Sequence, residues 1–287
     1  MISRLRDGTP VESYDGQGGI IRFLYGTSLG QFLLKPLIRP GFSRFMGCLL
    51  SCRISRWIVP GFIRRNRISM EDYPEQRYAS FNDFFTRSIL PGKRPVDLDP
   101  AHLVAPCDSK LTVIPLTEDV SFSIKGVPYT AQSLLRSEAL SRQFSGGYLL
   151  LFRLTVDDYH HYIYPVDGYE GAAAVIPGVF HTVNPYAAGQ CAIYRENTRC
   201  YTCTRSACGT VLQMEVGALM VGKIRNHRCS GSVQRGQEKG LFEFGGSTVV
   251  LMLERDRLLP DADLLENSEA GEETIVKMGE KIGTFLI

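Results

Sequence analysis

Residues 244–253 read FGGSTVVLML, two glycines and two hydroxyl side chains followed by five apolar residues. A continuous apolar run of this length after turn residues is typical of a buried strand. From about residue 103 the chain contains a series of short strand-like runs, of which this is one. They lie at residues 111–115, 147–156, 172–176, 211–216, 218–224, 241–244, 248–253 and 274–285. One helix, residues 131–140 capped by Thr130, interrupts them. Many short strands at close spacing predict an α+β fold whose body is a mainly antiparallel β sandwich or barrel-like structure.

The composition describes a globular chain whose charge is unevenly distributed. Of its 287 residues 44% are hydrophobic and 22% charged, which excludes a disordered, collagen-like or repetitive protein. The net charge of +2 argues against a nucleic-acid-binding protein. Residues 16–70, however, contain nine basic residues and no Asp or Glu, so the rest of the chain carries −7. A basic N-terminal segment is therefore joined to an acidic body.

The basic segment also carries many large apolar side chains. Aromatic and aliphatic residues are interspersed with Lys and Arg, and Pro36, Pro40 and Pro60 divide the segment into short amphipathic helices. This composition is typical of interfacial helices that meet anionic lipid headgroups. A helical layer that covers the protein's own core is the alternative. We expect a basic helical membrane-association region at residues 1–70, followed by a β-rich domain at residues 71–287.

The location of the protein follows from its apolar runs and its cysteines. No stretch reaches the roughly 18 uninterrupted apolar residues of a membrane-spanning helix, and no signal peptide opens the chain. We expect a peripheral membrane protein on the cytoplasmic face of the cell membrane, with its eight cysteines reduced. Cys200, Cys203 and Cys208 are close in sequence, but no regular spacing supplies a fourth zinc ligand, so we expect no metal.

Three residues have side chains suited to chemistry, although each also has an ordinary structural explanation. Ser247 follows two glycines, so its hydroxyl can attack the carbonyl carbon of Gly246 in an N-to-O acyl shift; a glycine turn that enters a strand is the alternative. His160 follows the end of a predicted strand, where scaffolds present functional groups, and imidazole accepts a hydroxyl proton near neutral pH. Asp108 lies among apolar neighbours. Together they supply the acid, base and nucleophile of a charge-relay triad, whose geometry spacing does not establish.

Four segments resemble successive signatures of the phosphatidylserine decarboxylase family. They are FNDFFTR at residues 81–87, APCD at 105–108, DYH at 158–160 and FGGST at 244–248. They occur in the family's order, and the resemblance covers about residues 75–287. It implies a proenzyme that cleaves itself between Gly246 and Ser247. Ser247 then becomes an N-terminal pyruvoyl group on a small chain of residues 247–287.

The resemblance also implies the reaction. The covalent pyruvoyl cofactor derived from Ser247 would form a Schiff base with phosphatidylserine, accept the electrons released as carbon dioxide leaves, and yield phosphatidylethanolamine. Asp108, His160 and Ser247 become the catalytic residues, and residues 71–287 the catalytic domain. The implied partners are a phospholipid substrate, an anionic membrane surface and the chain's own two fragments, with a homodimer as one candidate assembly. No metal or nucleic acid is implied.

One position departs from the family pattern. Members commonly have a second histidine three residues after the first, and this chain has Ile163 there, whereas His161 is an additional histidine. His160 then serves both self-cleavage and substrate protonation, or another group shares this work. His161 is an auxiliary candidate, together with Tyr162, His181 and His227.

The residues alone leave three other functions open. A pyruvoyl-dependent decarboxylase of a soluble amino acid is the first, and the basic apolar N-terminus argues against it. A serine hydrolase with the same triad and no self-cleavage is the second, and it needs an oxyanion hole. A non-enzymatic lipoyl-like β module is the third, and it gives no reason for the four ordered segments.

Overall fold

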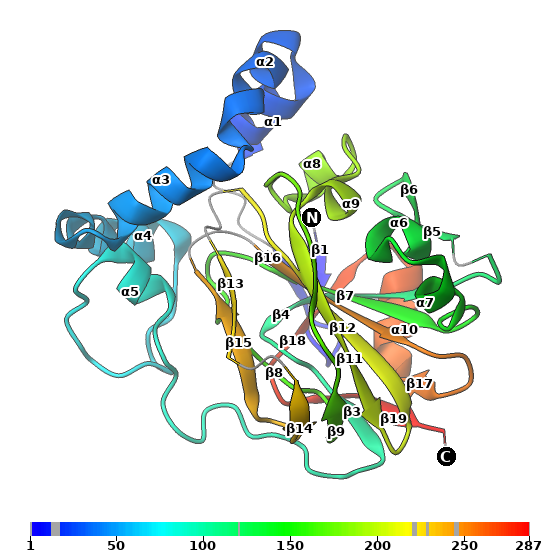
Figure 1. Cartoon of the computed structure of the whole chain (residues 1–287). Helices are drawn as coiled ribbons and strands as arrows, with labels where there is room; N and C mark the ends of the chain where they lie inside the picture. The colour runs from blue at the N-terminus through cyan, green and yellow to red at the C-terminus, as the bar shows by residue number, and fades with distance from the viewer. Residues whose placement is uncertain are drawn as a thin grey trace.

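A large, mostly antiparallel sheet forms the centre of the molecule (Figure 1). The computed structural model describes residues 2–12, 18–119, 121–219, 223–227, 230–243 and 247–286. The strand order is β14-β9-β11-β12-β16-β7-β4-β18-β1-β2, with β10 also paired to β11. Among these described strands, β1 and β18 are the only neighbours that pair in parallel. These strands are β1 Ile2–Arg4, β2 Pro10–Glu12, β4 Ser109–Pro115, β7 Tyr148–Leu154, β9 Gly168–Glu170, β10 Ala174–Ile176, β11 Arg199–Ser206, β12 Gly209–Val216, β14 Gly231–Val233, β16 Ser247–Leu253 and β18 Glu273–Val276.

Smaller sheets and short helices surround the large sheet. The smaller sheets are β13 (Ile224–Asn226) with β15 (Glu238–Phe242) and β8 (His161–Ile163), β17 (Leu258–Pro260) with β19 (Lys281–Phe285) and β3 (His102–Val104), and β5 (Ser121–Ile124) with β6 (Val127–Thr130). The helices are α1 Gly18–Gly26, α2 Ser28–Leu37, α3 Pro40–Ser51, the 3-10 helix η1 Arg53–Ile58, α4 Val59–Asn66, α5 Phe81–Phe85, α6 Ala131–Leu135, α7 Glu138–Arg142, α8 Pro185–Ala188, α9 Ile193–Glu196 and α10 Ala262–Glu269.

Strand β16 is buried along its whole length. It lies between β12 and β7, and all seven of its residues are buried. Its neighbours β7 and β12 are also mostly buried, and the three strands contribute much of the main hydrophobic core. The predicted buried strand is confirmed. A central strand is buried on both faces, so it is formed by an apolar run without alternating polar residues.

Other predicted elements are present with different bounds. The predicted helix at residues 131–140 is two helices, α6 and α7, because Arg136 adopts a left-handed conformation with φ 51°. The run at residues 274–285 forms two strands, β18 and β19. Strand β11 was not predicted, because its Thr, Cys and Arg residues do not form an apolar run. Met220, Val221 and Gly222 lie outside the described residues, and among the described members of residues 218–224 it is Ile224 that enters a strand.

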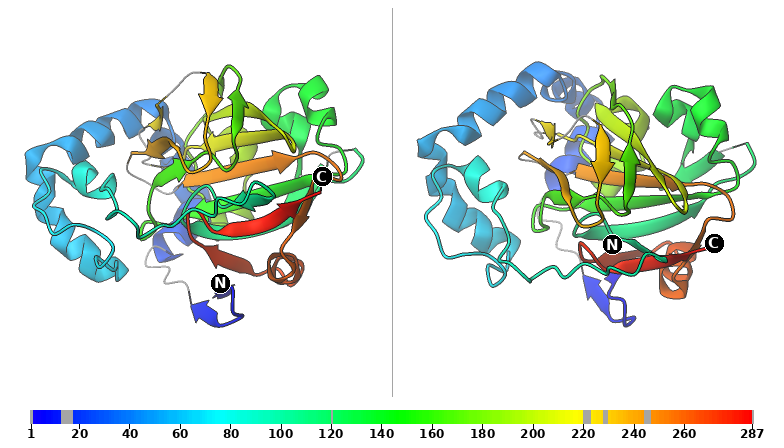
Figure 2. Two further views of the ribbon diagram at one scale, coloured as in Figure 1. Left: turned by 90° about the horizontal axis from the view of Figure 1, so that it is seen from below. Right: turned by 60° about the horizontal axis from the view of Figure 1, so that its bottom comes forward.

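Helices α1 to α4 lie along one side of the β-rich body (Figures 1 and 2). Pro40 and Pro60 lie in the first turns of α3 and α4, where the missing backbone donor costs nothing. Only a narrow stripe of side chains on these helices is buried, including Ile21, Tyr25 and Leu34. Within the part of the chain that the structure describes, no helix combines the length and apolar character required to span a bilayer.

Helix α5 connects the helical layer to the body. Its N-cap is Ser80, whose hydroxyl accepts a hydrogen bond from the amide of Asp83 at 3.1 Å. Its aromatic residues enter a small core shared with α3, α4 and the segment after α4. The buried residues of this core are Leu50, Val59, Ile68, Phe81, Phe84 and Phe85.

The α+β prediction is confirmed, with a mainly antiparallel β body. Over the described ranges the large sheet stays open, with β14 and β2 at its edges, so it is not a closed barrel. The division at residue 70 stays a prediction.

A buried ion pair links β7 to β18 across β4. Arg153 donates from Nε and Nη2 to the two carboxylate oxygens of Glu273, at 2.9 and 2.5 Å. Both residues are almost fully buried. Although burial opposes ionisation, the hydrogen bonds with Arg153 lower the pKa of Glu273.

We predict that Arg153→Met lowers the free energy of unfolding by about 3–5 kcal/mol, because it leaves the Glu273 charge buried without a partner. Urea unfolding of Ser247→Ala protein, which is expected to stay uncleaved, measures the effect. The control Arg142→Met removes one partner of an exposed ion pair with Glu138 and should change stability little. Equal effects of the two substitutions would contradict the prediction.

Candidate active site

Ser247, the first residue of β16, is fully buried. It lies opposite Leu154, the last residue of β7. Its Oγ has no hydrogen-bond partner among the described residues. A buried hydroxyl without a partner costs on the order of 1–3 kcal/mol, so its presence calls for an explanation. Gly245 and Gly246 lie outside the described residues, and so does the bond that the sequence predicts to be cleaved.

His160 lies immediately before β8 and is also fully buried. Its Nδ1 is 2.9 Å from the backbone oxygen of Asp158, and because a carbonyl oxygen only accepts, Nδ1 carries a proton. Nε2 is buried without a hydrogen-bond partner in the described part of the chain. Burial and the nearby charge of Arg87 lower the pKa of His160 to about 3, so the ring is neutral near pH 7. Nε2 therefore has the free lone pair of a general base.

The backbone places His160 and Ser247 near the same end of the β7–β16 pair. His160 comes six residues after Leu154, which lies opposite Ser247. Its carbonyl oxygen accepts a hydrogen bond at 2.9 Å from the amide of Phe242, five residues before Ser247. No hydrogen bond joins Nε2 to Oγ, since each atom lacks a partner among the residues described.

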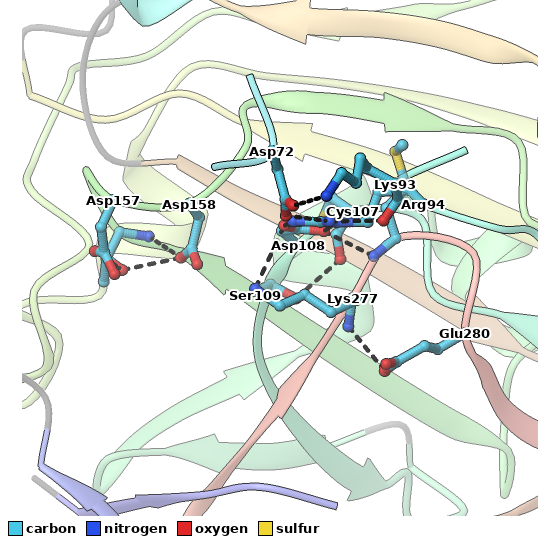
Figure 3. A network of polar contacts seen from close by, with 12 residues as sticks. Asp72, Lys93, Arg94, Cys107, Asp108, Ser109, Asp157, Asp158, Lys277 and Glu280 are labelled. Carbon is cyan, nitrogen blue, oxygen red and sulfur yellow. Dashed lines mark hydrogen bonds and ion pairs between the residues drawn. The ribbon is translucent and has the colours of Figure 1, made fainter. Parts of the chain in front are cut away.

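Asp108 belongs to a separate ionic cluster, drawn in Figure 3. Arg94 donates to both of its carboxylate oxygens, at 2.8 and 2.6 Å, and the amide of Met278 donates to Oδ1 at 2.9 Å. Arg94 also binds Asp72 at 2.9 Å. Burial opposes the charge of Arg94, yet its hydrogen bonds with Asp108 raise the pKa of the guanidinium. In this structure the orienting partner of His160 is thus the Asp158 carbonyl and not the Asp108 carboxylate.

Asp158 positions this region with both its backbone and its side chain. While its carbonyl oxygen holds His160, its carboxylate accepts hydrogen bonds from Lys110 at 2.9 and 2.8 Å. The amide of Thr155 donates to the same carboxylate at 2.7 Å. Lys110 lies on β4, so this contact ties the histidine segment to the large sheet.

Both ring nitrogens of His161 are engaged. Nε2 is 3.1 Å from the backbone oxygen of Thr86, and Nδ1 is 3.1 Å from a carboxylate oxygen of Glu238. Its ring stacks on Tyr159 with centroids 4.6 Å apart. The other oxygen of Glu238 binds His227 at 2.6 Å, and the hydrogen bonds with the two histidines, that of His161 first, lower the pKa of Glu238. His161 therefore links β8 to β15 and to the end of α5, and His227, just after β13, makes a second contact with β15.

The other residues considered for the role of the second family histidine also have hydrogen-bond or ion-pair partners. Tyr162 donates to the side-chain oxygen of Asn226 at 3.0 Å. His181 contacts Tyr25 at 3.1 Å and Glu196 at 3.3 Å, on the side of α1. His160 is thus the histidine whose ring has a buried nitrogen without a partner among the described residues.

The sequence prediction missed a buried ion pair between Lys239 and Glu215. Nζ of Lys239 lies 2.6 Å from the carboxylate, and both side chains are almost fully buried. Glu215 is opposite Val249, so it shares a sheet face with Ser247, two residues along β16. The available signal was a single Glu inside the apolar run of residues 211–216.

The cysteines provide no sign of a metal site in the described ranges. Cys200 and Cys203 are three residues apart on β11, so their side chains point to opposite faces of the sheet. No group of three or more His, Cys, Asp or Glu arranged for a metal occurs among the residues described.

We predict that His160 makes stability depend on pH. The unfolded chain binds a proton at this histidine below about pH 6.5, whereas the folded chain binds it only near pH 3. The stabilisation that the neutral His160 gives to the folded state is fully present above pH 6.5. Below that pH, the free energy of unfolding falls by about 1.4 kcal/mol per pH unit as the pH drops toward 3. Urea unfolding of Ser247→Ala protein between pH 4.5 and 7.5, with and without His160→Gln, should give the shallower slope for His160→Gln. Parallel slopes would contradict this prediction.

Known proteins resemble this chain over most of its length. The sequence model for the family described as phosphatidylserine decarboxylase matches residues 81–284. Phosphatidylserine decarboxylase proenzyme 2 of Clostridium acetobutylicum is 44% identical over 269 residues, which cover 93% of this chain and 92% of the relative. The phosphatidylserine decarboxylase proenzymes of Chlamydia trachomatis and Fusobacterium nucleatum are 36% and 33% identical over 92% and 98% of this chain, and 90% and 96% of their own lengths. These matches show that the chain belongs to the phosphatidylserine decarboxylase family of carboxy-lyases.

Proposed function

We propose that the chain cleaves itself between Gly246 and Ser247 and then converts phosphatidylserine to phosphatidylethanolamine with a pyruvoyl group derived from Ser247. Membership of the family supports the reaction. The observation that carries the mechanism is the pair of buried atoms without partners in the described chain, Oγ of Ser247 and Nε2 of His160. One is a proton donor and potential nucleophile, and the other is a proton acceptor.

Self-cleavage uses these two atoms first. Nε2 of His160 takes the hydroxyl proton of Ser247 as Oγ bonds to the carbonyl carbon of Gly246. The carbon–nitrogen bond between the two residues then breaks, and the nitrogen receives the proton, so the amide becomes an ester. Loss of the Ser247 Cα proton expels Gly246 as a carboxylate. Addition of water and release of ammonia leave a ketone at the new N-terminus.

The surroundings of Ser247 fit a pyruvoyl group. Its neighbours Leu154 and Val249 are apolar and buried, and Phe85 packs on the His160 ring with centroids 4.1 Å apart, which keeps water from the imidazole. The pyruvoyl group supplies a carbonyl that takes up the electrons released when the substrate carboxylate departs. We assign to His160 the transfer of a proton to the carbon that lost the carboxylate. Its neutral Nε2 first takes that proton from the ammonium group of the substrate, which has to lose it to form the Schiff base. For Asp108 we propose a positioning role, through Arg94 and Met278.

The helical layer supports binding to a membrane surface. All nine basic residues of the segment at residues 16–70 are exposed. Seventeen large hydrophobic residues are exposed in the described chain, and ten of them lie in this segment. These ten are Ile20, Phe23, Leu29, Phe32, Leu33, Phe45, Leu49, Ile54, Trp57 and Ile58. A layer that only covered the protein's own core would bury these side chains. Exposed apolar groups among cations complement an anionic bilayer surface.

We predict that purified protein gives two fragments on a denaturing gel. Intact-mass measurement should find a small chain of residues 247–287 with a ketone in place of its N-terminal amine. Ser247→Ala should leave one full-length chain and abolish decarboxylation of phosphatidylserine, whereas Ser232→Ala, a serine on β14, should be cleaved normally. Uncleaved wild-type protein that decarboxylates phosphatidylserine would refute the mechanism, and labelling of Ser247 by a fluorophosphonate would favour a serine hydrolase.

We also predict that the protein binds anionic vesicles through η1. Trp57 is the chain's one tryptophan, and it is 75% exposed, so its fluorescence reports transfer into an apolar phase. Emission should shift to shorter wavelength with phosphatidylglycerol–phosphatidylcholine vesicles, and much less with phosphatidylcholine alone or in high salt.

A matched pair of substitutions tests the position of this surface. Ile54→Ser should weaken binding about 10- to 100-fold, because burial of one aliphatic side chain contributes about 1.5–3 kcal/mol. Leu98→Ser, at a residue of similar exposure outside the helices, should have no effect. Equal binding by both variants would contradict the assignment.

A further inference from the structure

Arg87, two residues after α5, is a buried cation with an unpaired edge. Its side chain is 2% exposed, and Nη1 donates to the backbone oxygen of Phe84 at 3.2 Å. Nε and Nη2 are buried and have no hydrogen-bond partner among the described residues. Within the same residues, Arg87 forms no ion pair with an Asp or Glu. A buried charge in this condition is strongly destabilising unless an anion accompanies it.

The free edge of Arg87 is the one that binds an anion through two hydrogen bonds. Nε and Nη2 are the atoms with which Arg153 holds both oxygens of Glu273 in this protein. The guanidinium of Arg87 is fixed by aromatic rings, since its central carbon lies 4.1 Å from the ring centre of Tyr73 and 4.6 Å from that of Phe84. Arg87 is therefore a preoriented fork without an anionic partner in the part of the chain that the structure describes.

Arg87 lies beside the candidate active site. Phe85 packs on the His160 ring, and the Thr86 carbonyl oxygen contacts His161. The charge of Arg87 contributes, after burial, to the lowered pKa of His160, so the two groups are close enough to interact. An anion bound to Arg87 would therefore lie next to the atoms that process the substrate.

We propose that Arg87 binds the phosphodiester group of the lipid substrate. This inference rests on the proposed function, because the substrate has two anionic groups and the reaction treats them differently. The carboxylate loses its charge as carbon dioxide leaves, so a cation bound to it would stabilise the ground state and slow the reaction. The phosphodiester keeps its charge throughout and offers two oxygens to the fork.

The test compares two substrates in the same detergent micelles. One is phosphatidylserine, and the other is a serine O-alkyl ether, which has the amine and the carboxylate but no phosphate. Arg87→Gln should raise KM for phosphatidylserine with a smaller effect on kcat. The preference for phosphatidylserine over the ether, as a ratio of kcat/KM values, should fall about 10- to 100-fold. Arg87→Lys should give an intermediate ratio, and Arg77→Gln, at an exposed arginine ten residues earlier in the chain, should give the wild-type ratio.

Self-cleavage on a denaturing gel reports whether each variant folds, independently of lipid binding. An equal loss of activity on both substrates would assign Arg87 to the carboxylate or to the fold, and an unchanged ratio would exclude it as a substrate ligand. Either outcome overturns the proposal, as does failure of both Arg87 variants to cleave. Failure of the proposed function is a different result, because the wild-type protein would then act on neither substrate.

Discussion

The ion pair between Lys110 and Asp158 is the contact on which the geometry of the site depends. It anchors the segment after β7 to β4, at 2.8 and 2.9 Å, in a buried setting where separation of the charges would be costly. Because the carboxylate of Asp158 is fixed, its backbone oxygen is also fixed, and that oxygen determines which nitrogen of His160 carries the proton. The tautomer of His160 therefore follows from an electrostatic contact that does not involve the imidazole.

Sequence patterns predict the centre of the fold better than its periphery, for a physical reason. An apolar run such as residues 248–253 has one stable location, between two other strands, and the structure places it there. Strand β11 could not be predicted in this way, because it carries Thr, Cys and Arg instead of an apolar run. Its position in the sheet is given by its backbone hydrogen bonds to β12. The break at Arg136 depends on a single left-handed backbone conformation, which no local pattern indicated.

The candidate site was predictable in its residue types and not in its contacts. Ser247 and His160 were proposed from a glycine pair and a strand end, and both are buried in the structure with a polar atom that lacks a partner among the described residues. The partner expected for His160 was Asp108, but a bidentate guanidinium is a stronger partner for a carboxylate than a neutral imidazole, and Arg94 occupies Asp108. The sequence showed Arg87 only as the last residue of the segment FNDFFTR. That two of its nitrogen atoms are buried without a hydrogen-bond partner among the described residues depends on three-dimensional packing.

The position of β16 between β12 and β7 gives the proposed cleavage an unusual physical character. Both neighbours of the strand precede residue 246, so a cut before Ser247 leaves the small chain hydrogen bonded on both sides to the large one. The fragments would share one hydrophobic core and could separate only by unfolding together. Cleavage would change the covalent connectivity and free a chain end beside the site, while the topology of the sheet would stay that of a single polypeptide.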